Sequence, residues 1–408
     1  MARVHPRLLV IGALALLLSI RLAPIVASDF PLGAGGLFVV MAHDLRENSF
    51  ALPAFSTYND GTIPFAYPPL GLYLVALIPG DPIDTLRWLP LLYSLISVAG
   101  TWLLARELAG QRVAIVAVMA FAAMPITWVI EGGGVTRGLG FALLILMLWR
   151  VVVLLRDASL SNAVVAGVLG GLAVLSHPSV GPAAVASVVL FAAFRPSLRG
   201  VLFAAVAMIA GALVVMPWII AVTSVHGLDP FIHALGAHVQ APALVRLLAF
   251  GPSWLGALDP ILPTAVIGAA ILLRRGSWMI PAWLVLLFLV PGGDGRYAAL
   301  PWAILAAEGG LFVWDALRPI GAHRLAAGAV LVLLLAASLI ASYQRFQPVP
   351  AGVRAAMADG PPNPTRADDP AVEWYPALTG QVHPAAYFGY EWTASWDDRL
   401  ALYKALLP

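Results

Sequence analysis

Long apolar stretches, separated by short polar segments, run through most of the chain. A membrane-spanning helix needs about 20 consecutive, mostly apolar residues. Stretches of this kind predict about eleven spanning helices, at residues 8–27, 88–105, 113–130, 139–155, 161–176, 180–194, 200–224, 253–273, 277–290, 298–317 and 325–342. The pattern is typical of an all-α polytopic membrane protein.

Two stretches need a closer interpretation. Residues 8–27 resemble a cleaved signal peptide, but Ile25 is bulky where a small residue is wanted and a whole membrane domain follows, so we expect an uncleaved first span. Residues 64–79 are interrupted by Pro68 and Pro69. Free backbone at two prolines is tolerated only where protein or water surrounds it, which predicts a re-entrant or interfacial segment.

The connection between the first two spans is long. It covers residues 28–87, and loops beyond about 12–15 residues are usually functional or disordered. Its richness in Phe, Leu, Pro and Tyr argues against disorder. Residues 35–48 repeat apolar positions at helical spacing, which predicts an amphipathic helix lying along the membrane surface.

The arginines predict the orientation, because cytoplasmic loops carry an excess of basic residues. With the N-terminus in the cytoplasm, the cytoplasmic ends of the spans hold Arg3, Arg7, Arg106, Arg112, Arg150, Arg156, Arg195, Arg199, Arg274, Arg275, Arg318 and Arg324. The short outer loops hold Arg46, Arg87, Arg137, Arg246 and Arg296. We therefore expect a multi-pass protein of the inner or plasma membrane, with an extracytoplasmic C-terminal tail.

Composition supports this class and excludes others. Hydrophobic residues make up 61% of the 408 positions and charged residues 11%, with a mean hydropathy of +0.90. Soluble domains average about 25% charged residues, so this chain could not cover a water-facing surface. Cysteine is absent, which excludes disulfides and thiol chemistry, and a net charge of +2 gives no indication of a nucleic-acid partner.

The acids are distributed opposite to the arginines. The predicted outer loops contain Asp29, Asp44, Glu47, Asp60, Asp81, Asp84, Glu131, Asp229 and Asp294. One interpretation is that the carboxylates solvate loops that lie in water. The other is a polar, acid-lined cavity at the outer face, and the loop sequences alone do not decide between them.

Two short motifs carry a resemblance to a known family. Gly35-Gly36-Leu37-Phe38 follows the first span, and Phe65-Ala66-Tyr67-Pro68-Pro69-Leu70 begins the second juxtamembrane segment. With the acid-bearing first loop, they resemble the GT-C superfamily of membrane glycosyltransferases, which includes protein-mannosyltransferase and aminoarabinose-transferase relatives. The resemblance implies a GT-C-like transmembrane domain over residues 1–342, with residues 28–87 as the first outer loop.

The resemblance also implies a reaction. The donor would be a polyprenyl-phosphate sugar at the outer membrane face, and the acceptor a glycan, a lipid or a protein. A hexosyl or pentosyl group would transfer with inversion, while a carboxylate of the first loop acts as general base on the acceptor hydroxyl. Cationic or hydrogen-bonding groups would hold the leaving phosphate.

The chain departs from the family at one point. Relatives commonly carry an acid just before Gly35-Gly36, where this chain has Gly33-Ala34. Of the remaining candidate bases, Asp29 ranks first because it lies where the first span meets the outer surface. Asp44 and Glu47 are further candidates, although we expect both to face water. Asp60 is the last candidate, and its sequence context is typical of a turn. A shifted base, an inactivated member and an altered residue at position 34 all explain the departure.

Candidate phosphate-binding residues lie on other outer segments. Arg137 follows a glycine run and begins a span, where an ionisable group is usually paired or functional. Arg296-Tyr297 resembles an Arg-Tyr element that precedes a late span in these transferases. Tyr67 belongs to the Pro-Pro-Leu motif, and His177 ends a span on the same side. The ordinary alternatives are that Arg137 is an interfacial arginine and that His177 only ends its helix. Arg21, within the first span, is expected to pair with an acid such as Asp29.

Metal and nucleotide sites have little support. His226, Asp229, His233 and His238 share one loop, but no signature fixes a metal there and a lid over a cavity fits equally well. No cofactor is indicated, and a divalent metal has no sequence support. The glycines of residues 161–176 predict close helix packing, not a phosphate loop.

The composition changes near residue 343. Residues 343–408 are predicted to form an extracytoplasmic tail, and in one interpretation this tail is the start of a larger, truncated domain. It contains two Glu-Trp pairs, Glu373-Trp374 and Glu391-Trp392, and a predicted short helix near 395–407. Repeated Glu-Trp pairs suit either a carbohydrate surface or an interfacial anchor.

Two other functions compete with sugar transfer. One is a transporter or flippase of a lipid-linked solute, which predicts internal repeats that the chain lacks. The other is an inactive relative that binds the lipid carrier.

Overall fold

The computed structural model describes residues 6–124, 126–195, 197–237, 261–290, 295–317, 328–338, 340, 348–359 and 371–405. Within these ranges the chain is helical with irregular connections, and the one β-bridge pairs Phe55 with Pro64. The predicted all-α class is therefore confirmed for the described part of the chain.

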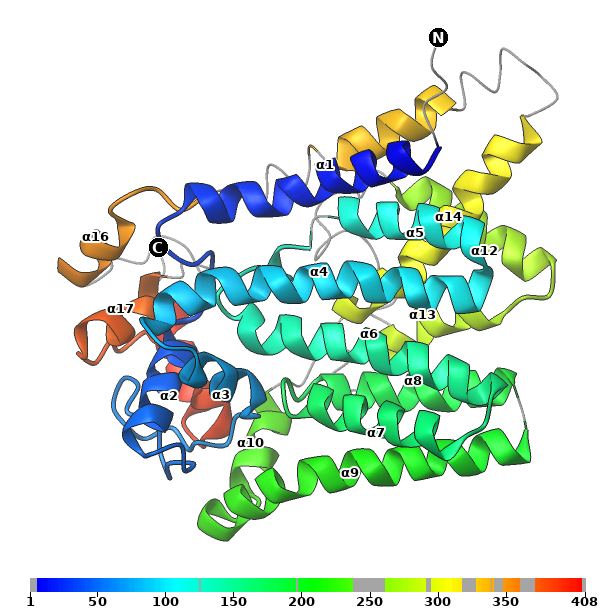
Figure 1. Cartoon of the computed structure of the whole chain (residues 1–408). Coiled ribbons are helices and arrows are strands. Elements are labelled where there is room, and N and C mark those ends of the chain that lie inside the picture. The colour runs from blue at the N-terminus through cyan, green and yellow to red at the C-terminus, as the bar shows by residue number, and fades with distance from the viewer. Residues whose placement is uncertain are drawn as a thin grey trace.

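The apolar helices form a bundle of roughly antiparallel rods (Figure 1). They are α1 (Pro6–Ala27), α4 (Pro82–Ala109), α5 (Gln111–Ala123), α6 (Gly134–Arg156), α7 (Leu160–Val174), α8 (Val180–Phe194), α9 (Leu198–His226), α12 (Leu262–Arg274), α13 (Met279–Leu289), α14 (Ala299–Ala316) and the helix Gly328–Ser338. By length and composition, α4, α6, α9 and Arg296–Ala316 can cross a membrane. The shorter apolar helices, of 10–17 residues, include α5, α7, α8, α12, α13 and the segment Leu14–Ala27 of α1. The count of about eleven spans stays a prediction.

The remaining helices lie in the connections and the tail. They are α2 (Gly36–Glu47), α3 (Leu70–Leu77), α10 (Asp229–Ala237), α16 (Val353–Asp359), α17 (Ala371–Thr379) and α18 (Trp396–Ala405), with the 3₁₀ turns η1 (Thr127–Val129), η2 (Gly295–Ala298) and η3 (Tyr390–Trp392). Figure 1 places α2, α3, α16 and α17 at one end of the bundle, which we call the first-loop end. At about 1.5 Å per residue, α3 is too short to cross a bilayer, in agreement with the predicted interfacial segment.

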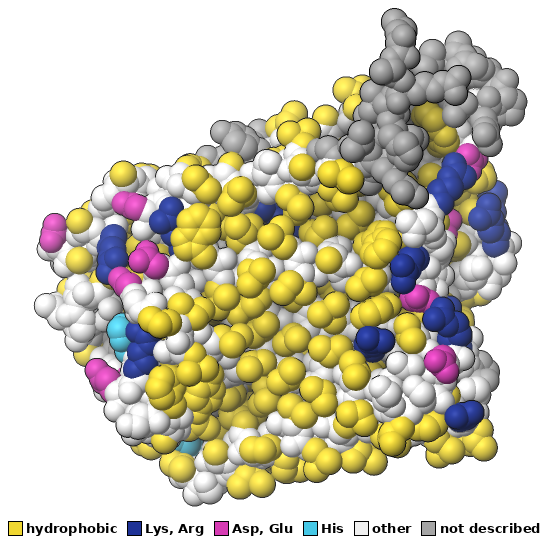
Figure 2. Space-filling model, viewed as in Figure 1, with side chains coloured by type: hydrophobic (Ala, Val, Ile, Leu, Met, Phe, Trp, Pro, Cys, Tyr) yellow, Lys and Arg dark blue, Asp and Glu magenta, His cyan; other side chains and the backbone are white. Residues whose placement is uncertain are grey.

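The surface has the distribution that a membrane requires. Figure 2 shows hydrophobic side chains over the middle of one face, whereas basic and acidic side chains gather toward its two ends. Large apolar side chains stay exposed along α9, among them Ile209 and Leu213 at 62% and 66%. A water-soluble protein would bury such a band, so its exposure indicates contact with lipid.

Small residues bring helices close together. An added Cβ at Gly268 would lie 1.9 Å from the carbonyl oxygen of Leu305, and one at Gly309 would lie 1.9 Å from that of Thr264. The glycines therefore let α12 and α14 pack backbone to backbone. Gly167 and Gly171 do the same between α7 and α9, which confirms the packing role predicted for them.

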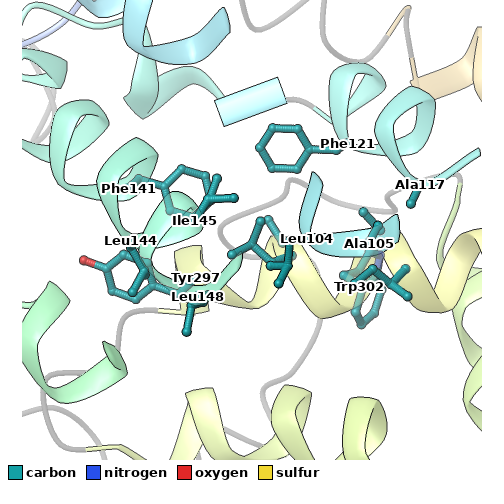
Figure 3. Packing of buried hydrophobic residues seen from close by; sticks show 14 of the residues in the cluster. Leu104, Ala105, Ala117, Phe121, Phe141, Leu144, Ile145, Leu148, Tyr297 and Trp302 are labelled. Carbon is teal, nitrogen blue, oxygen red and sulfur yellow. The ribbon is translucent and has the colours of Figure 1, made fainter. Parts of the chain in front are cut away.

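Aromatic residues fill the centre of the bundle. Phe121 of α5, Phe141 of α6 and Trp302 of α14 are buried there together with Tyr297 (Figure 3). The rings of Phe141 and Tyr297 lie 6.0 Å apart. This core fixes Tyr297 at the end of the bundle where α6 begins.

Arg21 does not pair with Asp29, and that prediction was wrong. The guanidinium is fully buried, and it donates hydrogen bonds to Ser94 Oγ at 2.5 Å and to the carbonyl oxygen of Phe121 at 3.0 Å. The Phe121 carbonyl belongs to the last turn of α5, where the helix dipole is negative. Arg21 thus ties α1 to α4 and α5.

The tail packs onto the first loop. Trp374 of α17 lies 4.5 Å from the ring of Phe30, and Tyr58 Oη donates to the carbonyl oxygen of Glu373 at 2.8 Å. Asn59 Nδ2 donates to Tyr390 Oη at 3.1 Å. Because these contacts bury aromatic side chains from both segments, the described tail and the first loop share one hydrophobic core.

Candidate active site

The segment before α2 runs against the connection between α5 and α6. Gly132 N donates to the carbonyl oxygen of Leu32 at 2.7 Å, and Gly133 N donates to that of Ala34 at 2.5 Å. Gly33 has a φ of +60°, a left-handed conformation that favours glycine. The absence of an acid at positions 33 and 34 thus coincides with a tight backbone contact.

Glu131 fills the space that a side chain at position 33 would need. A Cβ added to Gly33 would lie 2.9 Å from Glu131 Cγ and 3.0 Å from its Cδ. Glu131 Oε2 forms an ion pair with Arg137 Nη2 at 3.6 Å, and the two side chains are 26% and 22% exposed. A Cβ at Gly133 would meet the same Nη2 at 2.5 Å, so that glycine makes room for the guanidinium.

Tyr67 lies beside this ion pair. Its hydroxyl is 3.3 Å from Thr136 Oγ1, and Thr136 precedes Arg137 at the start of α6. Burial raises the pKa of Tyr67 to about 12, even though Thr136 and Arg137 act in the opposite direction. Tyr67 is therefore a neutral hydrogen-bonding group at physiological pH.

The Pro-Pro-Leu motif places Tyr67 next to the end of α7. Leu70 N donates to the carbonyl oxygen of Leu175 at 2.9 Å, and the rings of Tyr67 and His177 lie 6.1 Å apart. Pro69 occupies the N-cap position of α3, where a missing N–H costs little. The prolines thus start the helix and direct Tyr67 inward.

A chain of hydrogen bonds joins His177 to Tyr297. His177 Nδ1 lies 2.8 Å from Ser179 Oγ, which lies 2.6 Å from Tyr297 Oη. Arg296 stands beside Tyr297, with its guanidinium 5.7 Å from the ring centre of Trp128. The charge of Arg296 also acts on the pKa of Tyr67, which places the two within electrostatic reach.

The residues predicted to bind phosphate therefore come together. Tyr67, Arg137, His177, Arg296 and Tyr297 form what we call the cationic cluster, at the first-loop end where α6 and α14 begin. Guanidinium groups and neutral hydroxyls are the groups that hold a phosphate and the charge that develops on it. Sequence spacing gave no indication of Thr136, Ser179 and Trp128, which connect them.

The predicted first-loop acids lie outside this cluster. Asp29 and Glu47 are exposed, and Asp29 Oδ2 accepts from Gly352 N at 3.5 Å. Asp60 is a turn residue as predicted: it accepts from Thr62 N at 3.2 Å and pairs with Arg399. Its role as a base stays a prediction, as does that of Asp29.

Asp44 does not face water, and that expectation was wrong. The residue is 4% exposed, and its carboxylate accepts from Ser56 Oγ at 2.7 Å and from Thr57 N at 3.0 Å. A buried carboxylate with this many donors holds the loop against α2. The helical pattern identified the amphipathic face but not the loop that folds back over it.

Glu373 is a buried acid that sequence reasoning did not single out as a candidate. It is 1% exposed, and its two carboxylate oxygens accept from Gly35 N at 2.7 Å and Leu37 N at 3.2 Å. Burial raises the pKa of Glu373 to about 7, against the backbone hydrogen bonds and the charge of Arg137. The one signal in the sequence was the repeated Glu-Trp pair.

The second Glu-Trp pair, Glu391-Trp392 of the tail, lies next to Tyr67 of the cluster. The ring of Trp392 lies 5.9 Å from that of Tyr67, and Glu391 Oε2 accepts from Gly389 N at 2.7 Å. The charge of Glu391 contributes to the raised pKa of Tyr67. The tail therefore forms part of the wall of the candidate site.

The described residues do not form a metal site. Among them, no three His, Asp or Glu side chains come close enough to hold an ion. His226 Nε2 lies 2.7 Å from the carbonyl oxygen of Ala54, and His238 lies outside the described residues.

A cavity of about 420 Å³ lies between the first loop and α9. It is lined by Leu52, Pro53, Phe65, Tyr73, Ala221, Val222, Ser224, Val225 and His226, which are mostly apolar. Phe65 connects it to the Pro-Pro-Leu motif. The lining suits an apolar group better than a sugar or a phosphate.

Comparison with known proteins identifies similar chains. The family model for dolichyl-phosphate-mannose-protein mannosyltransferases matches residues 67–223, whereas no curated protein sequence matches. The archaeal oligosaccharyltransferase AglB from Archaeoglobus fulgidus, solved with an inhibitory peptide and a dolichol-phosphate, is similar with a TM-score of 0.62 and 14% identity. That match covers 97% of this chain and 68% of AglB.

Two further solved structures share the arrangement. The same oligosaccharyltransferase in its apo form gives a TM-score of 0.56 at 14% identity, over 96% of this chain and 64% of that one. ArnT from Cupriavidus metallidurans, bound to undecaprenyl phosphate, gives 0.58 at 15% identity, over 92% of this chain and 85% of ArnT. This chain thus spans about two thirds of the oligosaccharyltransferase and most of ArnT.

Proposed function

We propose, since the chain has the fold of the GT-C glycosyltransferases, that it transfers a sugar from a polyprenyl-phosphate donor to an acceptor at the outer membrane face. The transferred group is a hexose or pentose, and the acceptor is a glycan, a lipid or a protein. The anomeric centre inverts, and a carboxylate acts as general base.

The observation that carries this proposal is the cationic cluster. Arg137 and Arg296 are 159 positions apart, yet both act on the pKa of Tyr67. Two guanidinium groups with neutral tyrosine hydroxyls provide the donors that a phosphate monoester or diester needs. The solved relatives AglB and ArnT were captured with polyprenyl phosphates, which supports the same ligand class here.

The chemistry follows from the charges. The bond from the anomeric carbon to the phosphate oxygen breaks, and the leaving phosphate takes the electron pair. Its added negative charge is stabilised by Arg137 and Arg296, in a site that Trp128 and Trp392 flank. The apolar cavity beside Phe65 and α9 is suited to the first isoprene units. Asp29 is the base that the sequence ranks first.

Transfer in proteoliposomes tests the proposal. The purified chain is reconstituted with a panel of radiolabelled polyprenyl-phosphate sugars and extracted membrane glycans, lipids and peptides. We expect label to move to an acceptor, and both Arg137→Ala and Arg296→Ala to raise the donor KM. Arg354→Ala is the matched control, because Arg354 forms an exposed ion pair with Asp81 away from the cluster.

The same assay separates the competing functions. Donor binding without transfer, lost in Arg296→Ala, would indicate an inactive carrier-binding relative. Movement of intact donor between leaflets, measured by access to an added hydrolase, would indicate a flippase. Transfer of label in the wild type and its loss in the cluster variants would contradict both.

A further inference from the structure

We infer that Glu131 is the general base of this site: the side chain from the α5–α6 connection takes the place of the acid that the first loop lacks. The inference rests on the proposed function and names the residue that carries out its proton transfer. It assigns the role to a carboxylate that no first-loop motif contains.

The geometry at Gly33 is the first observation. The Cδ of Glu131 lies 3.0 Å from where a Cβ at position 33 would be, so the Glu131 carboxyl occupies the volume that a first-loop acid would enter. The hydrogen bonds from Gly132 N to Leu32 and from Gly133 N to Ala34 keep the two segments in this register. The acid is therefore supplied in space by a residue nearly a hundred positions further along the chain.

Accessibility separates Glu131 from two other acids near the first loop. Its side chain is 26% exposed, so a substrate hydroxyl can reach it. Asp44 is buried under three hydrogen bonds, and Glu373 is buried with both oxygens on backbone N–H groups. Because Asp44 is 4% and Glu373 1% exposed, an acceptor hydroxyl cannot reach either carboxylate.

Position separates it from two further acids. Asp60 forms an ion pair with Arg399, on the tail. Asp29 is exposed, and its Oδ2 accepts from Gly352 N at 3.5 Å. Of these five acids, Glu131 is the one that pairs with a residue of the cationic cluster.

Arg137 orients the base and connects it to the leaving group. Its Nη2 lies 3.6 Å from Glu131 Oε2, and the neighbouring Thr136 contacts Tyr67. In the reaction, Glu131 takes the proton from the acceptor hydroxyl while the oxygen bonds to the anomeric carbon. The carbon–oxygen bond to the phosphate breaks with its electron pair, and Glu131 then releases the proton to water.

Isosteric variants test the assignment. Glu131→Gln, Asp29→Asn and Asp84→Asn are compared with the wild type in the transfer assay; Asp84 is an exposed acid in the first turn of α4 and serves as the control. For Glu131→Gln we expect kcat to fall by about 10²–10⁴-fold, the usual contribution of a general base, with little change in the donor KM. The acidic limb of the pH–rate profile should disappear, and formate should restore part of the activity of Glu131→Ala.

The outcomes are distinct. If the wild type transfers sugar and Glu131→Gln retains its kcat, the assignment fails and the proposed function stands. A loss of activity confined to Asp29→Asn, or a rise in KM alone, would also overturn it. An unchanged thermal midpoint in detergent, together with rescue by formate, excludes misfolding as the cause. Failure of the wild type with every donor would overturn the proposed function, and the assignment with it.

Discussion

The carboxylate of Glu373 accepts a 2.7 Å hydrogen bond from the backbone N–H of Gly35, although 338 positions separate the two residues. Helix α2 begins at Gly36 without a side-chain cap of its own. A negative group at this end is favoured by the free N–H groups and by the helix dipole. Glu373 therefore acts as a cap supplied by the tail.

Removing this cap should release the tail. Glu373→Ala deletes the hydrogen bonds from the N–H groups of Gly35 and Leu37, which are worth on the order of 2 kcal/mol in total. We expect faster hydrogen exchange in α17 and the start of α2, measured by mass spectrometry in detergent. Glu47→Ala, an exposed acid at the other end of α2, should leave both segments unchanged; equal effects of the two variants would contradict the capping role.

The same contact should depend on pH. The pKa of Glu373 is raised from 4.5 to about 7 in the folded protein. Below pH 4.5 the group is protonated whether the tail is docked or released, and above about pH 7 it is ionised in both states. Between these values the docked state binds more protons, so docking should weaken as the pH rises through this window.

Exchange of α17 measured from pH 4 to 8, after correction for the intrinsic pH dependence of exchange, checks this sign. Glu373→Gln carries no titrating group and should flatten the profile. A docking free energy that strengthens with rising pH, or an unaltered profile in the Gln variant, would assign the titration to another group.

Adjacent glycines in α14 should respond oppositely to alanine. A Cβ at Gly309 would lie 1.9 Å from the Thr264 carbonyl oxygen, whereas the nearest atom to one at Gly310 is Leu331 Cδ2 at 3.6 Å. Overpacking of this kind costs about 1–3 kcal/mol or more. Gly309→Ala should lower the thermal midpoint, while Gly310→Ala should keep or raise it because alanine favours the helix. Equal midpoints would contradict the close approach of α12 and α14.

Arg21 should stabilise the bundle without taking part in catalysis. Arg21→Ala leaves the Phe121 carbonyl and Ser94 without this donor, at a cost of about 3 kcal/mol for lost charge-assisted hydrogen bonds. Thermal unfolding in detergent measures the loss. Ser19→Ala, at an exposed position of the same helix, is the control and should have little effect. A stable Arg21→Ala protein would mean that water or another group replaces the guanidinium.

The Tyr297 hydroxyl should contribute to donor binding. Tyr297→Phe removes the hydrogen bond to Ser179 but keeps the ring packed on Phe141 (Figure 3). We expect a donor KM about tenfold higher, the equivalent of one lost hydrogen bond, with an unchanged thermal midpoint. Tyr375→Phe, whose hydroxyl donates to Gln381 in the tail, is the matched control. An unaltered KM would remove Tyr297 from the binding site.

The family resemblance came from few residues. Tyr67-Pro68-Pro69-Leu70 and the glycine pair before Leu37 indicated a resemblance to the GT-C superfamily. A family model matches residues 67–223, and the chain shares the fold of AglB and ArnT, so the comparisons bear out that resemblance. Such motifs are detectable because a tight turn into a helix restricts the residues at consecutive positions. Arg137 stood out because an ionisable group at the start of an apolar span is usually paired or functional. Arg296 stood out because Arg296-Tyr297 resembles an element that precedes a late span in these transferases.

Other site features have no local signature. Asp44 lies on a helix whose pattern suggested an exposed position, yet the loop at Ser56 covers it. Arg21 pairs with the end of α5 and not with the nearest acid in sequence. Glu131 appeared only as one of several outer-loop acids, because nothing in the sequence brings it beside Gly33.

The sequence by itself determined the class of protein and the approximate positions of the apolar helices, because hydrophobicity over about 20 residues is a local property of the chain. The tertiary structure alone decided which charged groups meet. Glu131 faces Gly33, and Glu373 caps α2, because separate connections fold onto one end of the bundle. Contacts between residues hundreds of positions apart depend on how all the helices pack, and no short segment encodes that packing.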